Sequence, residues 1–247
     1  MRLAVLGAGP AYTDRQDAVG AAYLVTLDGT ALLLDLGQGA FPRLFPHIRP
    51  TELDAVVVSH LHPDHFIDLV PLRHYLRYEF EPPRRVRVIG PAGLGERLDA
   101  LHAEPGFTAA SLDCEMMGPT INQIGSLSVE ARLVSHTDES YALRVAGPDG
   151  PGLVYSGDCG RPFDLAPLIR PGDTLLTEVA FGPGPVPAGV LHLDGPGVGA
   201  LAAATHPGRI LLTHVLADRD LDQTIASIRA RWDGPVAFVW PGDSLDV

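Results

Sequence analysis

The chain has 247 residues, of which 46% are hydrophobic and 19% charged, a balance typical of a globular protein and not of a disordered or membrane-embedded one. A chain of this length can bury its apolar surface around one core, so we expect a single domain spanning residues 1–247. The formal net charge is −12, all basic side chains are arginines, and the one short basic run lies at 84–87, which disfavours a long nucleic acid as partner.

Cysteine content and apolar runs narrow the class of protein further. Only Cys114 and Cys159 occur, far apart in the chain, which indicates neither a disulfide framework nor a cysteine-rich zinc module. No apolar run reaches membrane-spanning length, and the chain starts without a hydrophobic leader. We therefore expect a soluble, cytoplasmic protein that does not engage membranes. The composition does not determine the assembly, and it is compatible with a homodimer.

The first half of the chain predicts strands that alternate with helices. The Asp28-Gly29 pair between two β-rich runs is a strong signal for a two-residue hairpin turn. Hydrophobic periodicity predicts strands at 2–7, 21–27, 30–37, 54–60 and 86–90, and helices at 65–79 and 93–104.

The second half continues the same alternation. Its pattern predicts strands at 127–136, 141–147, 153–158, 174–181, 209–214 and 236–240, and helices at 163–169, 196–206 and 221–232. Hairpin-linked strands mixed with helices in both halves favour an α/β fold in which two mixed sheets pack together with helices outside.

A cluster of histidines and an aspartate follows the predicted strand at 54–60, in the order His60-x-His62-x-Asp64-His65. Histidines two positions apart on an extended segment point the same way, so His60 and His62 can hold one ion. Asp64 and His65, beyond the turn favoured by Pro63, can then face a second ion. Imidazole and carboxylate ligands suit zinc, manganese or iron. The alternative is a solvated histidine-rich turn, but such crowding is costly without a cation, which favours a metal site.

Further polar residues lie where other predicted strands end: His136, Asp158, Glu178 and His214. Taken singly, a histidine in such a place is more often a buried packing residue, and Asp158 is more often a turn residue. Together with the first cluster, however, they supply enough ligands for two metal ions that share one bridging carboxylate.

The order of these motifs resembles that of the metallo-β-lactamase superfamily, and the resemblance includes the segment "LLLDLGQG" before the first histidine motif. It implies a four-layer αβ/βα sandwich with a dinuclear metal site at one edge. It also implies zinc as the first expectation for both divalent ions, with manganese or iron as alternatives. One ion would be held by His60, His62 and His136, the other by Asp64, His65 and His214, and Asp158 would bridge them.

Within that superfamily, the segments "LLTEVAF", "HLDGPGVGALAAA" and "RILLTHV" are similar to the ribonuclease Z-like branch. The similarity implies that Glu178 and His192 assist proton transfer to the leaving group, a role that a carboxylate-oriented histidine suits chemically. The chain also departs from that branch. His136 and Asp158 are only 22 positions apart, which leaves no room for the arm that grips transfer RNA. Thr177 replaces a common histidine, and Cys159 replaces a common threonine.

These features predict a dinuclear-metal-dependent hydrolase, in first place a phosphodiesterase acting on a small-molecule phosphodiester such as a cyclic nucleotide. Asp64 would orient the nucleophile, His192 with Glu178 would protonate the departing oxygen, and Arg161 is a candidate phosphate contact. The alternatives are a lactonase or other carboxylic-ester hydrolase, ribonuclease Z-like RNA processing, and a non-catalytic metal-binding protein. Phosphorus chemistry is favoured because ester hydrolysis would not require Glu178 and His192.

Overall fold

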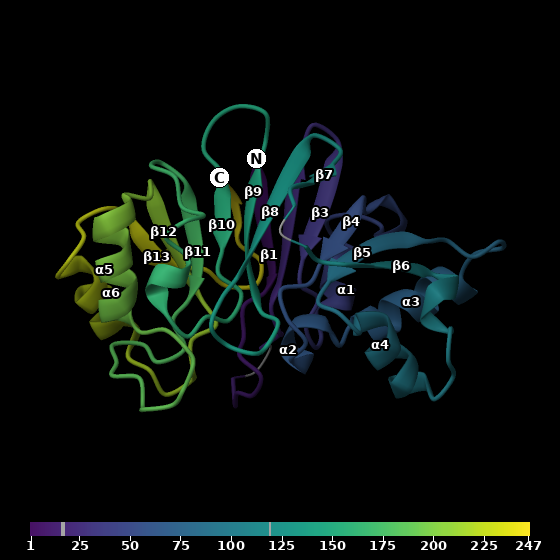
Figure 1. Cartoon of the computed structure of the whole chain (residues 1–247), viewed down its shortest axis with the longest axis horizontal. Coiled ribbons are helices and arrows are strands. Elements are labelled where there is room, and N and C mark those ends of the chain that lie inside the picture. The colour runs from purple at the N-terminus through teal and green to yellow at the C-terminus, as the bar shows by residue number, and fades with distance from the viewer. Residues whose placement is uncertain (16–17, 119) are drawn as a thin grey trace.

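The structure, a computed structural model, describes residues 1–15, 18–118 and 120–247. Two seven-stranded sheets pack face to face, and helices cover the outer face of each sheet (Figure 1). The strand orders are β14-β1-β2-β3-β4-β5-β6 and β13-β12-β11-β10-β9-β8-β7. The predicted α/β fold with a four-layer αβ/βα sandwich is confirmed.

The first sheet is antiparallel over β14-β1-β2-β3 and parallel over β3-β4-β5-β6. The hairpin turn between β2 and β3 is confirmed, with φ of 48° at Asp28 and 82° at Gly29. The strands, in spatial order, are β14 (Ser244–Asp246), β1 (Arg2–Gly7), β2 (Ala22–Leu27), β3 (Thr30–Leu34), β4 (Ala55–Val57), β5 (Val86–Gly90) and β6 (Leu112–Met116).

The second sheet is antiparallel from β7 to β10 and parallel from β10 to β13. Its strands, in spatial order, are β13 (Val236–Phe238), β12 (Arg209–Thr213), β11 (Thr174–Glu178), β10 (Leu153–Tyr155), β9 (Tyr141–Ala146), β8 (Leu127–Leu133) and β7 (Asn122–Ile124).

Helices α1 to α4 pack on the first sheet, and α5 and α6 pack on the second, at opposite sides of Figure 1. Asp194 and Asp220 begin α5 and α6 by accepting hydrogen bonds from the backbone N–H groups three residues on. None of the described helices has the length and apolar character needed to cross a membrane. The helices are α1 (Phe41–Leu44), α2 (Pro63–Phe66), α3 (Leu69–Tyr78), α4 (Leu94–His102), α5 (Gly195–Thr205) and α6 (Leu221–Arg229), with 3₁₀ turns η1 (Pro50–Glu52), η2 (Thr108–Ala110) and η3 (Pro162–Asp164).

Three apolar layers hold the sandwich together. Leu32 and Leu34 of β3 face the other sheet in the central core, whereas Leu33 packs beneath the helices of the first half. A third layer lies between the second sheet and its helices. Central strands are buried on both faces, which explains their continuous apolar runs in the sequence.

Several element boundaries differ from the prediction. The helix predicted over 65–79 is divided into α2 and α3 at Asp68, whose carboxylate accepts a hydrogen bond from the Phe41 N–H at 2.9 Å. The helix predicted over 163–169 is reduced to the turn η3. Strands β6, β7 and β14 were not predicted, because they are short, polar edge strands without an alternating apolar pattern.

A buried ion pair fastens the middle of the second sheet. Arg144 of β9 donates two hydrogen bonds to Asp173, at 2.7 and 2.9 Å, and the Gly152 and Arg170 N–H groups donate to the same carboxylate. Burial raises the pKa of Asp173, but these hydrogen bonds, led by that of Arg144, lower it below its ordinary value overall. The carboxylate is therefore ionised in the folded protein.

We expect Asp173→Asn to lower the free energy of unfolding by about 3–5 kcal/mol at pH 7, because it leaves Arg144 buried without its counter-charge. A depressed folded-state pKa stabilises the fold above the unfolded value, near 3.9, and this contribution is lost as the pH falls through the folded value. The difference between the two proteins should thus shrink below about pH 4. Urea unfolding across pH measures both effects, and equal stability at pH 7 would contradict the expectation.

Candidate dinuclear metal site

The sequence-predicted ligands all meet at one edge of the sandwich, where strands of both sheets end. His60 follows β4, His136 follows β8, Asp158 follows β10 and His214 comes directly after β12. His62 begins α2 as its N-cap, and Asp64 and His65 lie within that helix. Side chains separated by more than a hundred positions in the sequence are therefore brought within contact distance.

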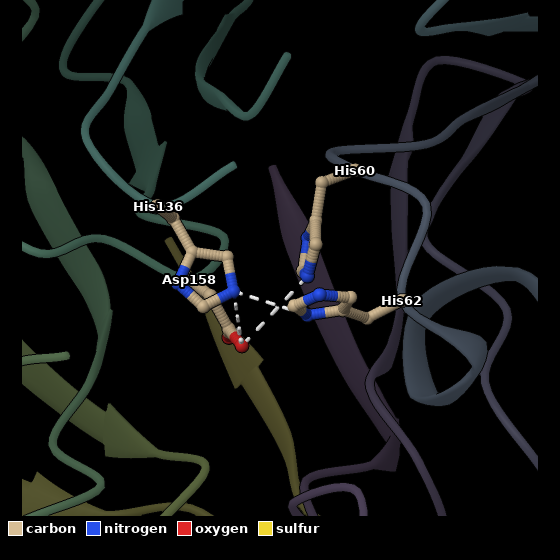
Figure 2. A group of neighbouring side chains, drawn as sticks. All are labelled: His60, His62, His136 and Asp158. Atoms are coloured by element: carbon tan, nitrogen blue, oxygen red, sulfur yellow. Dashed lines mark hydrogen bonds and ion pairs between the residues drawn. The ribbon is translucent and has the colours of Figure 1, made fainter. Parts of the chain in front are cut away.

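One group consists of His60, His62, His136 and Asp158, which point toward one another in Figure 2. Asp158 Oδ2 lies 3.8 Å from His60 Nε2 and 3.6 Å from His136 Nε2. His62 Nδ1 lies 3.1 Å from His136 Nε2. The other ring nitrogen of His136 donates to the Leu191 carbonyl at 2.7 Å, which directs Nε2 into the group.

A second group consists of Asp64, His65, Asp158 and His214. Asp158 Oδ1 lies 3.3 Å from His65 Nε2 and 3.4 Å from His214 Nε2, and Asp64 Oδ2 lies 3.2 Å from His214 Nε2. The two oxygens of Asp158 therefore face different groups, the arrangement that a carboxylate bridging two metal ions needs.

The donor atoms themselves test whether a cation fits. Among the described residues, several buried ring nitrogens and carboxylate oxygens of these groups have no hydrogen-bond partner, a costly arrangement unless an ion satisfies them. The unpaired atoms that face the two groups are His60 Nε2, His65 Nε2 and Asp158 Oδ1. The cluster is compatible with a divalent metal site built from imidazole and carboxylate ligands.

The electrostatics of the site favour an ionised bridge. Burial raises the pKa of Asp158, but the adjacent His214 and His65 outweigh this and hold it well below its usual value. Burial, followed by the charge of His65, lowers the pKa of His60 well below its usual value. Burial lowers the pKa values of His65 and His214, but Asp158 outweighs it and raises both, so these two rings would release a proton to solvent when a cation binds.

Asp35 supports His65 from behind, a role that the sequence analysis did not assign. Asp35 Oδ2 accepts hydrogen bonds from His65 Nδ1, Tyr155 Oη and Ser59 Oγ, each at 2.7 Å, and Oδ1 accepts the Ser59 N–H at 2.6 Å. This fixes the ring so that Nε2 faces the site. The available signal was a lone aspartate after the apolar run of β3, within "LLLDLGQG".

The backbone around Asp64 and His65 is packed closely against the residue before β2 and the segment after β3. The Ala21 N–H donates to the Asp64 carbonyl at 2.9 Å, and the Leu36 N–H donates to the His65 carbonyl at 2.8 Å. A Cβ atom on Gly37 would collide with the Asp64 carbonyl oxygen, so only glycine allows this approach.

Glu178, the last residue of β11, holds His192 at the edge of the site. Glu178 Oε1 lies 2.9 Å from His192 Nδ1, and the Cys159 and Leu193 N–H groups donate to the same carboxylate. Burial lowers the pKa of His192, but the hydrogen bond that its ring donates to Glu178 outweighs this and raises the pKa to about 9. Glu178 thereby fixes the orientation of the His192 ring through Nδ1 and leaves the other ring nitrogen, Nε2, free of contact with this carboxylate.

A cavity of about 460 Å³ opens onto these side chains. Arg161 does not line it, because the chain turns into η3 directly after Arg161 and leaves that side chain exposed to solvent. The structure therefore does not bring the predicted phosphate contact to the site. The lining residues are Pro10, Ala11, Tyr12, His62, Pro63, Asp64, Asp158, Ala180, Phe181, His192, His214 and Leu216.

Residues 30–215 match the family model of the beta-lactamase superfamily domain, and the chain belongs to that superfamily. Over its whole length it is 32% identical to the uncharacterized protein ML1173 of Mycobacterium leprae, covering 89% of that protein. It is 28% identical to ribonuclease Z of Mycobacterium marinum, over 78% of this chain and 72% of that protein.

Among solved structures, the metallo-β-lactamase fold protein YhfI of Bacillus subtilis superposes with a TM-score of 0.87 at 21% identity, over 99% of this chain and 98% of that chain. YhfI is named as a probable metallo-hydrolase and matches 98% of this chain and 100% of its own length at 24% identity. The chain is thus a metallo-hydrolase of the β-lactamase superfamily, related to ribonuclease Z.

We expect Asp35→Asn to weaken metal binding about 10- to 100-fold, because His65 would lose the carboxylate that orients its ring. Competition with a chromophoric zinc chelator measures the affinity. Asp54→Asn is a matched control, since Asp54 also accepts a backbone hydrogen bond but lies outside both ligand groups. Equal affinity in the wild type and the Asp35 variant would contradict the assigned role.

Proposed function

We propose that this chain is a dinuclear-metal-dependent phosphodiesterase acting on a small phosphodiester such as a cyclic nucleotide. The observation that carries the proposal is the pair formed by the buried Glu178 and the partly exposed His192, next to the Asp158 carboxylate whose two oxygens face different ligand groups. Zinc is the expected metal, with manganese or iron as alternatives. One ion would be held by His60, His62 and His136, and the other would be held by Asp64, His65 and His214. Asp158 would bind both ions.

Two divalent ions, when bound, would supply an activated water molecule and neutralise the phosphoryl oxygens. The chain's own groups then orient the reactants. Asp64 directs Oδ2 toward His214, whereas its Oδ1 is buried without a hydrogen-bond partner among the described residues. Oδ1 can therefore accept a hydrogen bond from the attacking water and align it.

His192 is placed to protonate the departing oxygen. Its Nδ1 is held by Glu178, and its ring lines the same cavity as Asp64 and Asp158. An alkoxide is a poor leaving group from phosphorus, so a proton donor at this position accelerates the cleavage of an alkyl phosphodiester. A carboxylic-ester hydrolase would not require this pair, which favours phosphorus chemistry over a lactonase.

The dimensions of the site favour a small substrate. The cavity of about 460 Å³ has the size of small-molecule sites in general. The hairpin β9–β10 fills the interval between His136 and Asp158, where transfer-RNA-processing relatives would carry an arm. The net charge of −12 also disfavours a long polyanion.

We expect His192→Ala to lower kcat about 10²- to 10⁴-fold on a cyclic nucleotide, whose ribose alkoxide needs a proton. On bis-p-nitrophenyl phosphate the loss should be much smaller, because p-nitrophenolate departs without protonation. Steady-state kinetics on both substrates measures the contrast. The exposed His47→Ala is the matched control and should leave both rates unchanged. Metal content is measured in parallel, and equal losses on both substrates at full metal content would rule out His192 as the acid.

A substrate panel tests the reaction class. With zinc or manganese added, we expect turnover of bis-p-nitrophenyl phosphate and cyclic nucleotides, and loss of this turnover in Asp64→Ala. Turnover of a lactone alone would replace the proposal with carboxylic-ester hydrolysis. Turnover of precursor transfer RNA would show that the arm is not needed, and full activity of the Asp64 variant would refute the dinuclear mechanism.

A further inference from the structure

A second cavity of about 370 Å³ adjoins the cavity over the metal ligands. We call it the side chamber. Its lining residues are Tyr12, Thr13, Asp14, Leu216, Ala217, Asp218 and Arg219. Tyr12 and Leu216 line both cavities, so the two meet at these side chains. A molecule with its phosphate at the metal ligands can therefore extend past Tyr12 into the side chamber.

Tyr12 is the aromatic side chain at this junction, and it is 76% exposed. Within the described part of the chain, its side chain makes no hydrogen bond, ion pair or ring contact. The other aromatic residue of the metal cavity, Phe181, is already covered, because the Arg219 guanidinium lies 5.2 Å from its ring centroid. The Tyr12 ring is thus open to a planar ligand, and nucleobases stack on such rings.

The walls of the side chamber are fastened to each other. Arg15 Nη2 donates hydrogen bonds to the Leu216 carbonyl at 3.3 Å and to the Ala217 carbonyl at 3.1 Å. The Arg15 guanidinium also lies 5.5 Å from the Trp240 ring centroid. These contacts tie the segment that carries Tyr12 to the segment that follows His214, so the chamber is formed before a ligand arrives.

The side chamber offers hydrogen-bond acceptors to a base. Asp14 and Asp218 contribute two carboxylates to the lining; the Arg219 Nε lies 3.4 Å from Asp218, and the Arg15 guanidinium is bonded to the Leu216 and Ala217 carbonyls. The same carboxylates can accept hydrogen bonds from the amino group of a neutral base.

We propose that the side chamber binds the aromatic base of a nucleoside phosphodiester, with Tyr12 as the stacking platform. This inference rests on the proposed phosphodiesterase function and deepens it, since it names nucleosides as the substrate class. Tyr12 is then a specificity-determining residue that binds the substrate without touching the reacting atoms.

The test compares the binding of adenosine 5′-monophosphate with that of ribose 5-phosphate, which lacks only the base. Titration calorimetry on the zinc-loaded protein should show tighter binding of the nucleotide. Tyr12→Ala should weaken nucleotide binding about tenfold, within the range of base–aromatic stacking, and leave ribose 5-phosphate binding unchanged. Tyr12→Phe should retain wild-type binding. Tyr78→Ala removes another exposed tyrosine (65%) that lies outside both cavities, and it should have no effect.

Equal affinity of the wild type for the two ligands, or unchanged nucleotide affinity in Tyr12→Ala, would overturn the inference. Hydrolysis of cyclic AMP is measured on the same preparations, which separates this inference from the proposed function. If the protein hydrolyses cyclic AMP but binds the nucleotide no more tightly than ribose 5-phosphate, only the base-binding role of the side chamber is refuted. A Tyr12-dependent preference without hydrolysis of any phosphodiester refutes the phosphodiesterase and supports the chamber as a nucleotide site.

Discussion

The contacts of one buried carboxylate organise this molecule. Asp158 directs one oxygen toward His60 and His136 and the other toward His65 and His214. Such a division requires the ends of β4, β8, β10 and β12 to lie at the same edge, which in turn requires the two sheets to pack in this register. The apolar central core fixes the packing, and the packing fixes the distances on which the chemistry depends.

The sequence predicted which side chains meet at this edge, because histidine and aspartate at the ends of apolar strands are a local pattern with a chemical reason. It did not predict the support for His65, since Asp35 is a single aspartate 30 positions away and no local pattern pairs it with that ring. Arg161 was predicted as a phosphate contact from its proximity to Asp158 in the chain, but η3 leaves its side chain exposed. Edge strands such as β6 were missed because half-exposed, charged strands lack an apolar period.

The predicted metal ligands and the proposed base-binding residues occupy different parts of the sequence. The family match spans residues 30–215 and contains all seven ligands together with Glu178 and His192. Tyr12 and the lining residues at 216–219 lie outside that span. A superfamily can keep one metal-binding scaffold and change its substrate through the flanking segments, where insertions and replacements do not disturb the sheets.

The placement of the ligands has a mechanical consequence. Each group combines side chains from both halves of the sandwich. In one group, His60 and His62 of the first half meet His136 of the second; in the other, Asp64 and His65 of the first half meet His214 of the second. An ion bound by such a set cross-links the two sheets at their rim, and its binding free energy adds to that of sheet docking. A bound metal ion would thus also stabilise the contact between the two sheets at this edge, and chelation of such an ion would loosen that edge first.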